Sequence, residues 1–196
     1  MTKQEFLGNV TIYVDTREKE NRHITQALES IGVKWESRKL NLGDYSFAVT
    51  HNYAVLDFSS VVAIERKSGP GELYGNVMEK PLGNGQKCRF EKEVEAASRQ
   101  LNQFTLLIEG VPSMEALRAY VVPEHAMKAS PQRQQAEIGE PCYVRLRAWQ
   151  QANRYNLRVD FVANKADTAK KIVEEFYYYF HNYKSAIAPR GGKNHD

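Results

Sequence analysis

The chain has 196 residues, of which 42% are hydrophobic and 26% are charged, and its formal net charge at pH 7 is +3. These values are typical of a soluble globular protein that forms one ordinary domain. No apolar run approaches the roughly 20 residues that cross a bilayer, and the first residues lack the apolar core of a signal peptide. We therefore expect a protein of the cytoplasm, or of the nucleus in a eukaryote, with no membrane partner.

The first third of the chain alternates extended and helical patterns. Residues 1–9 are expected to be a short leader, and the apolar residues 10–14 predict a strand. A helix is expected over residues 20–31, because apolar residues recur there at the spacing of one helical face and Gly32 is a natural stop. The alternation of apolar and polar residues over 33–38 predicts a half-buried second strand.

Three more strands are predicted before residue 68. The glycine turn at Gly43-Asp44 leads into a strand over residues 45–49, and residues 53–58 form the next one. Residues 61–66 then form the central strand, because four apolar residues in a row are typical of a buried strand.

Glycines are frequent in residues 68–86, where a short helix is expected near residues 73–80. This segment is either a mobile surface loop or a DNA contact. The apolar stripe from Phe90 to Leu101 predicts a helix that faces the core. Residues 104–109 form the continuous apolar run expected of a strand that helices cover on both faces.

The last third of the chain is polar in its first part and periodic in its second. The predicted segments are a short helix over 112–120, an insertion or partly disordered loop over 123–141, a helix over 143–155, a strand over 157–162, and a final helix capped by Asp167 or Thr168. Residues 184–196 are expected to be a disordered basic tail beyond a folded domain of residues 1–183. This order of elements predicts an α/β fold, a three-layer sandwich with a central mixed β-sheet.

Charged residues follow the central strand without a turn. Side chains alternate along a strand, so Glu65 and Lys67 are expected on one face and Arg66 on the other. A carboxylate and an ammonium group together at a strand end suit metal-assisted attack on a phosphodiester. Charged residues also flank ordinary strands, so this triplet alone does not decide the function.

Other carboxylates stand at the ends of predicted elements. Asp15 and Glu18 follow the first strand, and Asp44 follows the glycine turn. Oxygen ligands of this kind suit hard divalent cations such as Mg²⁺ or Mn²⁺. A metal site is therefore predicted from Asp15, Asp44 and Glu65. Glu109 is expected either near this site or paired with a neighbouring base.

Neither the cysteines nor the histidines add a site to this pattern. Cys88 and Cys142 lack metal-type spacing, and a reducing compartment is the simplest explanation, with a disulfide left open. The five histidines are scattered along the chain, so no catalytic histidine is assigned.

Six blocks follow one another along the chain in a recognisable order. They are Asp-Thr-Arg-Glu at 15–18, Gly-Asp-Tyr at 43–45, Ile-Glu-Arg-Lys at 64–67, Arg-Phe at 89–90, Leu-Leu-Ile-Glu-Gly at 106–110 and Asp-Thr-Ala at 167–169. In this order they resemble the nuclease domain of the XPF family, which includes the Mus-type and Hef-type junction nucleases. The resemblance covers most of the chain.

The resemblance implies a core like that of restriction endonucleases, often written PD-(D/E)xK. It implies a DNA endonuclease that acts at flaps, forks or junctions in DNA repair or recombination. Asp44 and Glu65 would bind Mg²⁺ or Mn²⁺ with Asp15 nearby, and Lys67 would position the attacking water. The tandem helix-hairpin-helix module that usually follows the family's nuclease is not in this sequence, so we expect a stand-alone nuclease domain.

The resemblance also implies supporting residues. Glu18 would support the metal shell, and Arg66 would help to hold the site or a phosphate. The family has an aspartate where this chain has Gly71, and Glu72 stands one residue beyond it. Glu72 is therefore either a substitute with a supporting role or an exposed loop acid.

DNA and a second subunit are the expected partners. Four arginines, which are Arg17, Arg145, Arg147 and Arg154, are candidate DNA contacts, because clustered basic residues neutralise phosphates. A solvated helix face is the alternative explanation for each of them.

The last helix is apolar on more than one face. Its Val173, Tyr177, Tyr178 and Tyr183 predict a homodimer, or pairing with a related subunit, because such aromatic residues are enriched in interfaces. The alternative is that residues 123–141 fold over this surface.

Two other functions are left open. The protein could be a non-catalytic DNA-binding or scaffold subunit of a nuclease complex, or a restriction or repair nuclease that cuts plain duplex. The Gly-Asp and Glu-Arg-Lys blocks favour catalysis, because a degenerate subunit is expected to lose them.

Overall fold

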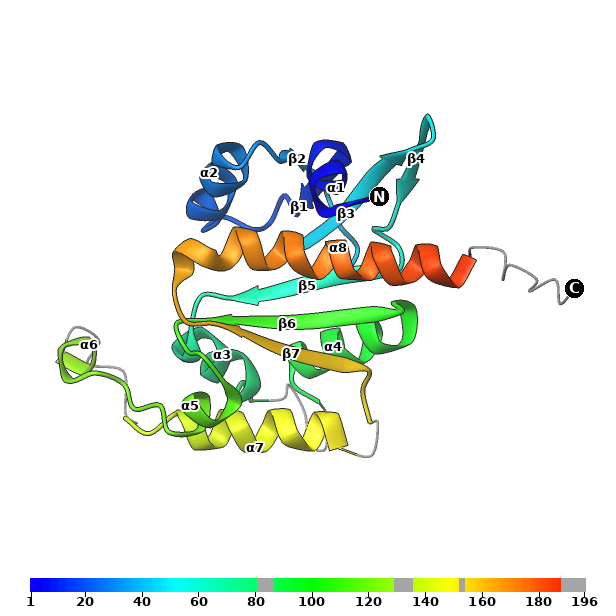
Figure 1. Ribbon diagram of the computed structural model, residues 1–196. Helices are drawn as coiled ribbons and strands as arrows, with labels where there is room; N and C mark the ends of the chain where they lie inside the picture. Colours follow the sequence, from blue (N-terminus) through cyan, green and yellow to red (C-terminus); the bar gives the residue numbers. More distant parts are fainter. Residues whose placement is uncertain (81–86, 129–135, 152–153, 188–196) are drawn as a thin grey trace, which may run out of the picture.

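The computed structural model describes residues 1–80, 87–128, 136–151 and 154–187. Its centre is a seven-stranded sheet in the order β2-β1-β3-β5-β6-β7, with β4 also paired to β3 (Figure 1). The strands are β1 (Val10–Val14), β2 (Lys34–Ser37), β3 (Tyr45–His51), β4 (Ala54–Asp57), β5 (Val62–Lys67), β6 (Gln103–Glu109) and β7 (Leu157–Val162). Pairs β1–β2, β5–β6 and β6–β7 are parallel, and pairs β1–β3, β3–β4 and β3–β5 are antiparallel. The predicted mixed sheet is confirmed.

Helices cover both faces of the sheet (Figure 1). The helices of the described residues are α1 (Lys3–Asn9), α2 (Arg22–Ser30), α3 (Pro70–Val77), α4 (Arg89–Gln100), α5 (Met114–Arg118), α6 (Glu124–Lys128), α7 (Gly139–Gln150) and α8 (Thr168–Ile187), of which α6 stands away from the sheet (Figure 1). Buried side chains of α1, α2 and α8 form one core cluster with the sheet, and those of α3, α4, α5 and α7 form another on the opposite face. The three-layer sandwich is therefore confirmed.

The side chains of β5 alternate between these two cores. Val62 and Ile64 belong to the cluster under α8, whereas Ala63 belongs to the cluster under α3 and α4. This alternation turns Glu65 and Lys67 toward α3 and α4 and turns Arg66 toward α2 and α8. The neighbouring strand β6 is buried from Phe104 to Glu109, as its continuous apolar run predicts.

The first nine residues are not a leader, because residues 3–9 form α1. Thr2 and Glu5 make a capping box at its start, and Phe6 is completely buried. The ring centroid of Phe6 lies 6.1 Å from that of Phe47 and 5.7 Å from that of Phe180. A seven-residue helix with one buried residue has no repeating apolar stripe, so its periodicity is too short to reveal it.

The segment 123–141, predicted as an insertion or loop, contains α6 and the first turn of α7; residues 129–135 lie outside the described part. A Cβ on Gly139 would overlap the carbonyl oxygen of Leu117, so glycine permits α7 to begin against the end of α5. Pro141 is tolerated in the first helical turn, where N–H groups have no intrahelical acceptor. The helix ends at Gln150 rather than at residue 155.

Other predicted boundaries shift at helix ends. Helix α3 begins at Pro70, before the expected start at residue 73, because proline suits the first helical position. Asn164 caps the short 3₁₀ turn of Lys165–Asp167 that leads into α8, and α8 itself begins at Thr168; its cap by Asp167 or Thr168 stays a prediction. Helix α8 continues through residues 184–187, which were expected to be tail; residues 188–196 lie outside the described part.

Cys88 and Cys142 are both buried and free. The disulfide that the sequence left open is therefore not formed. Burial raises the pKa of the Cys142 thiol to about 12, so this side chain behaves as a small apolar residue of the core.

Candidate active site

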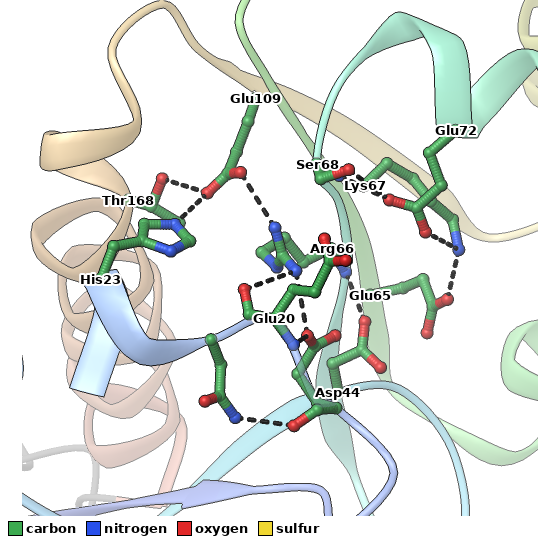
Figure 2. A network of polar contacts seen from close by, with 12 residues as sticks. Glu20, His23, Asp44, Glu65, Arg66, Lys67, Ser68, Glu72, Glu109 and Thr168 are labelled. Carbon is green, nitrogen blue, oxygen red and sulfur yellow. Dashed lines mark hydrogen bonds and ion pairs between the residues drawn. The ribbon is translucent and has the colours of Figure 1, made fainter. Parts of the chain in front are cut away.

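Asp44 is fixed against the end of β5 by backbone hydrogen bonds. Its N–H donates to the carbonyl oxygen of Ile64 at 2.8 Å, and its Oδ2 accepts from the N–H of Arg66 at 2.8 Å (Figure 2). Gly43, just before it, has a φ of +74°, and a Cβ there would lie 2.8 Å from the Cβ of Ala63. Glycine allows both the positive φ and the close approach, so Gly43 sets the position of Asp44.

Glu65 and Lys67 point to the same face of β5, as the strand alternation predicts. The Nζ of Lys67 donates to Oε1 of Glu65 at 2.7 Å and lies 4.5 Å above the ring centre of Phe90. Lys67 is 5% exposed, so its ammonium group is held between a carboxylate and an aromatic ring. This packing gives the lysine a defined direction at the strand end.

Glu72 lies in the first turn of α3 and reaches back to the end of β5 (Figure 2). Its Oε2 accepts from the N–H and the Oγ of Ser68, both at 2.8 Å, and its Oε1 lies 3.8 Å from the Nζ of Lys67. The bend before α3 therefore brings Glu72 next to Lys67, although it stands one residue past the family's aspartate. Its effect on catalysis stays a prediction.

A cavity of about 230 Å³ opens beside Asp44 and Glu65. Its lining consists of Arg17, Asn41, Leu42, Gly43, Asp44, Glu65, Arg89, Glu93 and Phe104. Sequence reasoning missed the roles of Arg89 and Glu93, which stand one turn apart on α4. The only sequence signal was the Arg-Phe block at the start of this helix, and the packing of α4 beside β5 is what places the two charges here.

Burial and neighbouring charges shift the pKa values of the two cavity carboxyl groups. Burial raises the pKa of Asp44 well above its usual value, and the charge of Glu65 adds to this. Burial also raises the pKa of Glu65, although Lys67 opposes the shift. Burial would lower the pKa of Lys67, but the charge and hydrogen bond of Glu65, together with the charges of Glu72 and Asp44, raise this pKa. Lys67 is therefore protonated at neutral pH, and a further cation would favour the ionised carboxylates.

Asp44 and Glu65 fit a hard divalent cation. Within the described residues, hydrogen bonds and ion pairs reach only Oδ2 of Asp44 and Oε1 of Glu65, which leaves one oxygen on each. The same residues contain no group of three or more His, Cys, Asp or Glu side chains that could hold a metal. Two carboxylates, completed by water and a substrate phosphate, are a ligand set that Mg²⁺ commonly uses.

Asp15, predicted as a metal ligand, holds a loop through both of its carboxylate oxygens, and its role as a ligand stays a prediction. Its Oδ1 accepts from the N–H of Arg17 at 2.8 Å and from the Nε of Arg17 at 2.7 Å, and its Oδ2 accepts from the N–H of Leu40 at 2.6 Å. Burial would raise the pKa of Asp15, but these hydrogen bonds lower it. Both oxygens are used and Asp15 does not line the cavity, so we assign it the positioning of Arg17.

Arg66 lies on the face of β5 that points away from the cavity. Its Nη1 donates to Oε2 of Glu109 at 2.9 Å, and its Nη2 donates to Oε1 of Glu18 at 2.9 Å and to the carbonyl oxygen of Glu20 at 3.1 Å (Figure 2). Glu18 and Arg66, predicted to act on the metal shell and on a phosphate, therefore bind each other behind the strand. They tie the loop between β1 and α2 to β5.

Glu109 is the centre of this network (Figure 2). It is completely buried, accepts from the Oγ1 of Thr168 at 2.6 Å, and lies 2.9 Å from the Nε2 of His23. Burial would raise the pKa of Glu109, but the hydrogen bonds from Thr168 and His23 and the charge of Arg66 lower it. The prediction that Glu109 pairs with a base is confirmed, and the pairing joins α2, β5, β6 and the start of α8.

Comparisons with known proteins agree with this arrangement. A family model described as the ERCC4 domain matches residues 14–174. The chain belongs to the ERCC4 domain family. A comparison with curated protein sequences found no match.

Two solved structures show the fold of this ERCC4 domain. XPF from Aeropyrum pernix matches with a TM-score of 0.57 and 18% identity, over 90% of this chain and 68% of that chain. XPF from Aeropyrum pernix in complex with DNA matches with a TM-score of 0.56 and 19% identity, over 88% of this chain and 66% of that chain. The predicted resemblance to the XPF nuclease domain and its restriction-endonuclease-like fold is confirmed.

Arg17 of the ERCC4 domain lines the cavity, whereas the other arginines expected to contact DNA do not. Arg145 and Arg147 lie on α7. Arg154 donates to Oε1 of Glu91 at 2.7 Å. DNA contacts by these three arginines stay a prediction, and the structure does not connect them to the cavity.

The surface of α8 that predicted a dimer is partly covered within the chain. Val173 is 3% exposed, and the ring of Tyr177 packs edge-on against Phe6 of α1 with centroids 5.5 Å apart. Helix α1 supplies this cover; the alternative of residues 123–141 falls partly on residues 129–135, which lie outside the described part. Tyr178 and Tyr183 are 55% and 38% exposed.

Within the described residues, no helix is both long and apolar enough to cross a membrane.

Proposed function

We propose that this ERCC4 domain is a metal-dependent DNA endonuclease that hydrolyses phosphodiester bonds with Mg²⁺ or Mn²⁺. The observation that carries the proposal is the meeting of Asp44 and Glu65 at one cavity, with Lys67 bonded to Glu65. A DNA substrate is supported by the likeness of the fold to XPF from Aeropyrum pernix in complex with DNA. Branched DNA, such as flaps, forks and junctions, is the substrate class that the family resemblance favours.

The residues of the cavity divide the chemistry between them. Asp44 and Glu65 would hold the cation through the oxygens that carry no hydrogen bond. When bound, such a cation supplies charge stabilisation at the phosphate and makes water more acidic. Lys67 is protonated, so it acts as a hydrogen-bond donor that orients the attacking water, not as a base that removes its proton. Arg66 and Gly43 keep Asp44 and β5 at their relative positions.

One cleavage assay tests the proposal. Purified protein is incubated with duplex, single-stranded, flap and junction DNA, with Mg²⁺, with Mn²⁺ or with a chelator, and the products are separated on a gel. We expect metal-dependent cuts that favour branched substrates. Equal cutting of plain duplex would point to the restriction or repair alternative. DNA binding without cleavage in either metal would point to a scaffold subunit and contradict the proposal.

Glu72→Ala is expected to lower kcat by up to about tenfold, the lower end of the range for residues that orient a metal site from outside. The reason is that Glu72 holds Ser68 and lies 3.8 Å from the ammonium group of Lys67. Steady-state cleavage rates measure the effect, with Glu36→Ala on the exposed strand β2 as the control. Glu72→Gln should restore part of the rate. Unchanged kinetics for Glu72→Ala would make Glu72 an ordinary exposed acid.

Tyr178→Glu is expected to weaken a homodimer by about 10- to 100-fold, because buried tyrosines are frequent hot spots of interfaces. Light scattering over a range of protein concentrations measures the shift toward monomer mass. Tyr53→Glu is the matched control, since Tyr53 is fully exposed at the turn between β3 and β4. Tyr177→Glu should instead destabilise the monomer, because Tyr177 packs on Phe6. A monomer mass for the wild type at high concentration would rule the dimer out.

A further inference from the structure

The cavity contains a second pair of charges that the proposed chemistry does not use. Arg89 and Glu93 both line it, and the Nη1 of Arg89 donates to Oε1 of Glu93 at 2.8 Å. Glu79 approaches the Nε of Arg89 at 3.8 Å. The side chains of Arg89 and Glu93 are 62% and 43% exposed, so solvent reaches the pair and it can open without unpacking the core.

The two guanidinium groups of the cavity are held very differently. Arg17 comes from the loop after β1. Its backbone N–H, Nε and Nη2 all donate hydrogen bonds to Asp15, which is 1% exposed. Arg89 comes from the first turn of α4, and its nearest partner is the exposed Glu93 of the same helix. An exposed pair one helical turn apart is weak, whereas a guanidinium binds a phosphate through a planar fork of donors. Of the two guanidinium groups, Arg89 is therefore the one that a phosphate can bind in place of its carboxylate partner.

The position of Arg89 suits an anion for a second reason. It is the first residue of a 12-residue helix, and the start of a helix carries a partial positive charge. In the described chain, Glu93 joins no group of three or more side chains that could hold a metal. Its Oε1 accepts the hydrogen bond from Nη1 of Arg89, and this bond explains its place in the cavity.

We propose that Arg89 binds a backbone phosphate of the DNA strand beside the one that is cut, and that Glu93 is the carboxylate which this phosphate displaces. The inference rests on the proposed function and deepens it, because it names a substrate-binding residue and its competitor at the same cavity. Glu93 then weakens the attraction of the empty cavity for anions, and a DNA strand must replace it to reach Arg89. The two residues should therefore have opposite effects on DNA affinity.

Fluorescence anisotropy of a labelled flap DNA, with Ca²⁺ in place of Mg²⁺ to prevent cutting, measures this. Arg89→Ala should raise Kd about tenfold and lower the slope of log Kd against log salt by about one phosphate contact. Glu93→Gln should lower Kd several-fold, because the competitor loses its charge. In cleavage assays, Arg89→Ala should raise KM and leave kcat unchanged, the sign of lost binding in both ground and transition states.

The same helix supplies matched controls. Arg99 and Glu95 form an exposed pair at 2.7 Å, also four residues apart, and neither lines the cavity. Arg99→Ala and Glu95→Gln change the net charge by the same amounts as the test variants and should leave Kd near the wild-type value. In the double variant Arg89→Ala/Glu93→Gln, the substitution of Glu93 should no longer lower Kd, because the guanidinium group of Arg89 that it frees for the phosphate is absent.

The outcomes separate this inference from the proposed function. A wild type that neither binds nor cuts DNA would contradict the proposed function itself. A wild type that cuts DNA, together with an Arg89→Ala variant of unchanged Kd and salt slope, would overturn the inference alone. Weaker DNA binding by Glu93→Gln, with a smaller rise in Tm on adding Mn²⁺, would also overturn it and make Glu93 part of the metal shell. An Mn²⁺-dependent rise in Tm that Arg89→Ala leaves intact supports the division of roles.

Discussion

Glu65→Gln and Asp44→Asn are expected to abolish metal-dependent cleavage, with kcat lowered by more than about a hundredfold. Loss of a residue that merely orients a metal ligand costs about 10- to 100-fold, so loss of a direct ligand should cost more. Both substitutions keep the shape of the side chain, and Asn at position 44 still accepts the hydrogen bond that the N–H of Arg66 donates at 2.8 Å. The loss of activity should therefore come without loss of the fold.

Thermal unfolding distinguishes this explanation from a folding defect. Mn²⁺ should raise the Tm of the wild type, because a ligand that binds only the folded state stabilises it, and it should raise the Tm of either variant much less. Without metal, Asp44→Asn should be at least as stable as the wild type, because burial penalises its charged carboxylate. Glu65→Gln should be less stable, because it removes the carboxylate that is bonded to the buried Lys67. Glu36→Gln on β2 is the control with one negative charge fewer at an exposed position. Wild-type cleavage by either variant would refute the assignment of the site.

Glu109→Gln is expected to lower the free energy of unfolding by about 3–5 kcal/mol, the usual effect of removing one partner of a buried ion pair. Arg66 would lose one of its two carboxylates while staying 4% exposed, and its remaining charge would be poorly compensated. For a chain of this length the corresponding fall in Tm is about 6–20 °C. Chemical denaturation followed by fluorescence measures the change.

A surface pair provides the control for this prediction. Arg118 and Glu140 are bonded at 2.6 Å, but their side chains are 55% and 50% exposed. Glu140→Gln should therefore change stability by no more than about 1 kcal/mol. If Glu109→Gln and Glu140→Gln have equally small effects, the buried network does not hold the layers together.

Protonation of Glu109 should contribute to the loss of folding stability at acid pH. Its pKa is lowered in the folded protein, so the folded pKa lies below the unfolded value of about 4.3. The stabilisation is fully present above the unfolded pKa and is lost as the pH falls through the folded pKa. The wild type should therefore lose this contribution in acid, and Glu109→Gln should lose less. An equal acid loss in both proteins would assign the effect to other carboxylates.

Much of the fold could be predicted, because strands and helices leave local periodic signals. The alternation along β5 placed Glu65 and Lys67 on one face and Arg66 on the other, since each side chain of a strand follows from its neighbour. The continuous apolar run of β6 predicted a strand buried on both faces. Helix α1 was missed because one buried phenylalanine in a seven-residue helix gives no period.

The carboxylates after β1 could not be assigned from the sequence. Asp15 and Glu18 have the right chemistry for a metal, but their roles depend on which hydrogen-bond donors the fold places next to them. Arg17 and the backbone N–H of Leu40 donate hydrogen bonds to Asp15. Arg66 donates to Glu18 on the face of β5 that points away from the cavity. These partners come from segments whose distance in space is set by the packing of whole layers.

The sequence by itself determined the order of the strands and of the longer helices, the face of β5 that carries Glu65 and Lys67, and the need for a turn before Asp44. Each of these depends on backbone geometry over a few residues, which the residue types specify locally. The tertiary structure alone decided that Arg89 and Glu93 share a cavity with Glu65, and that α1 covers part of α8. Such contacts form only when two layers close on the sheet, because they join side chains that no local period relates.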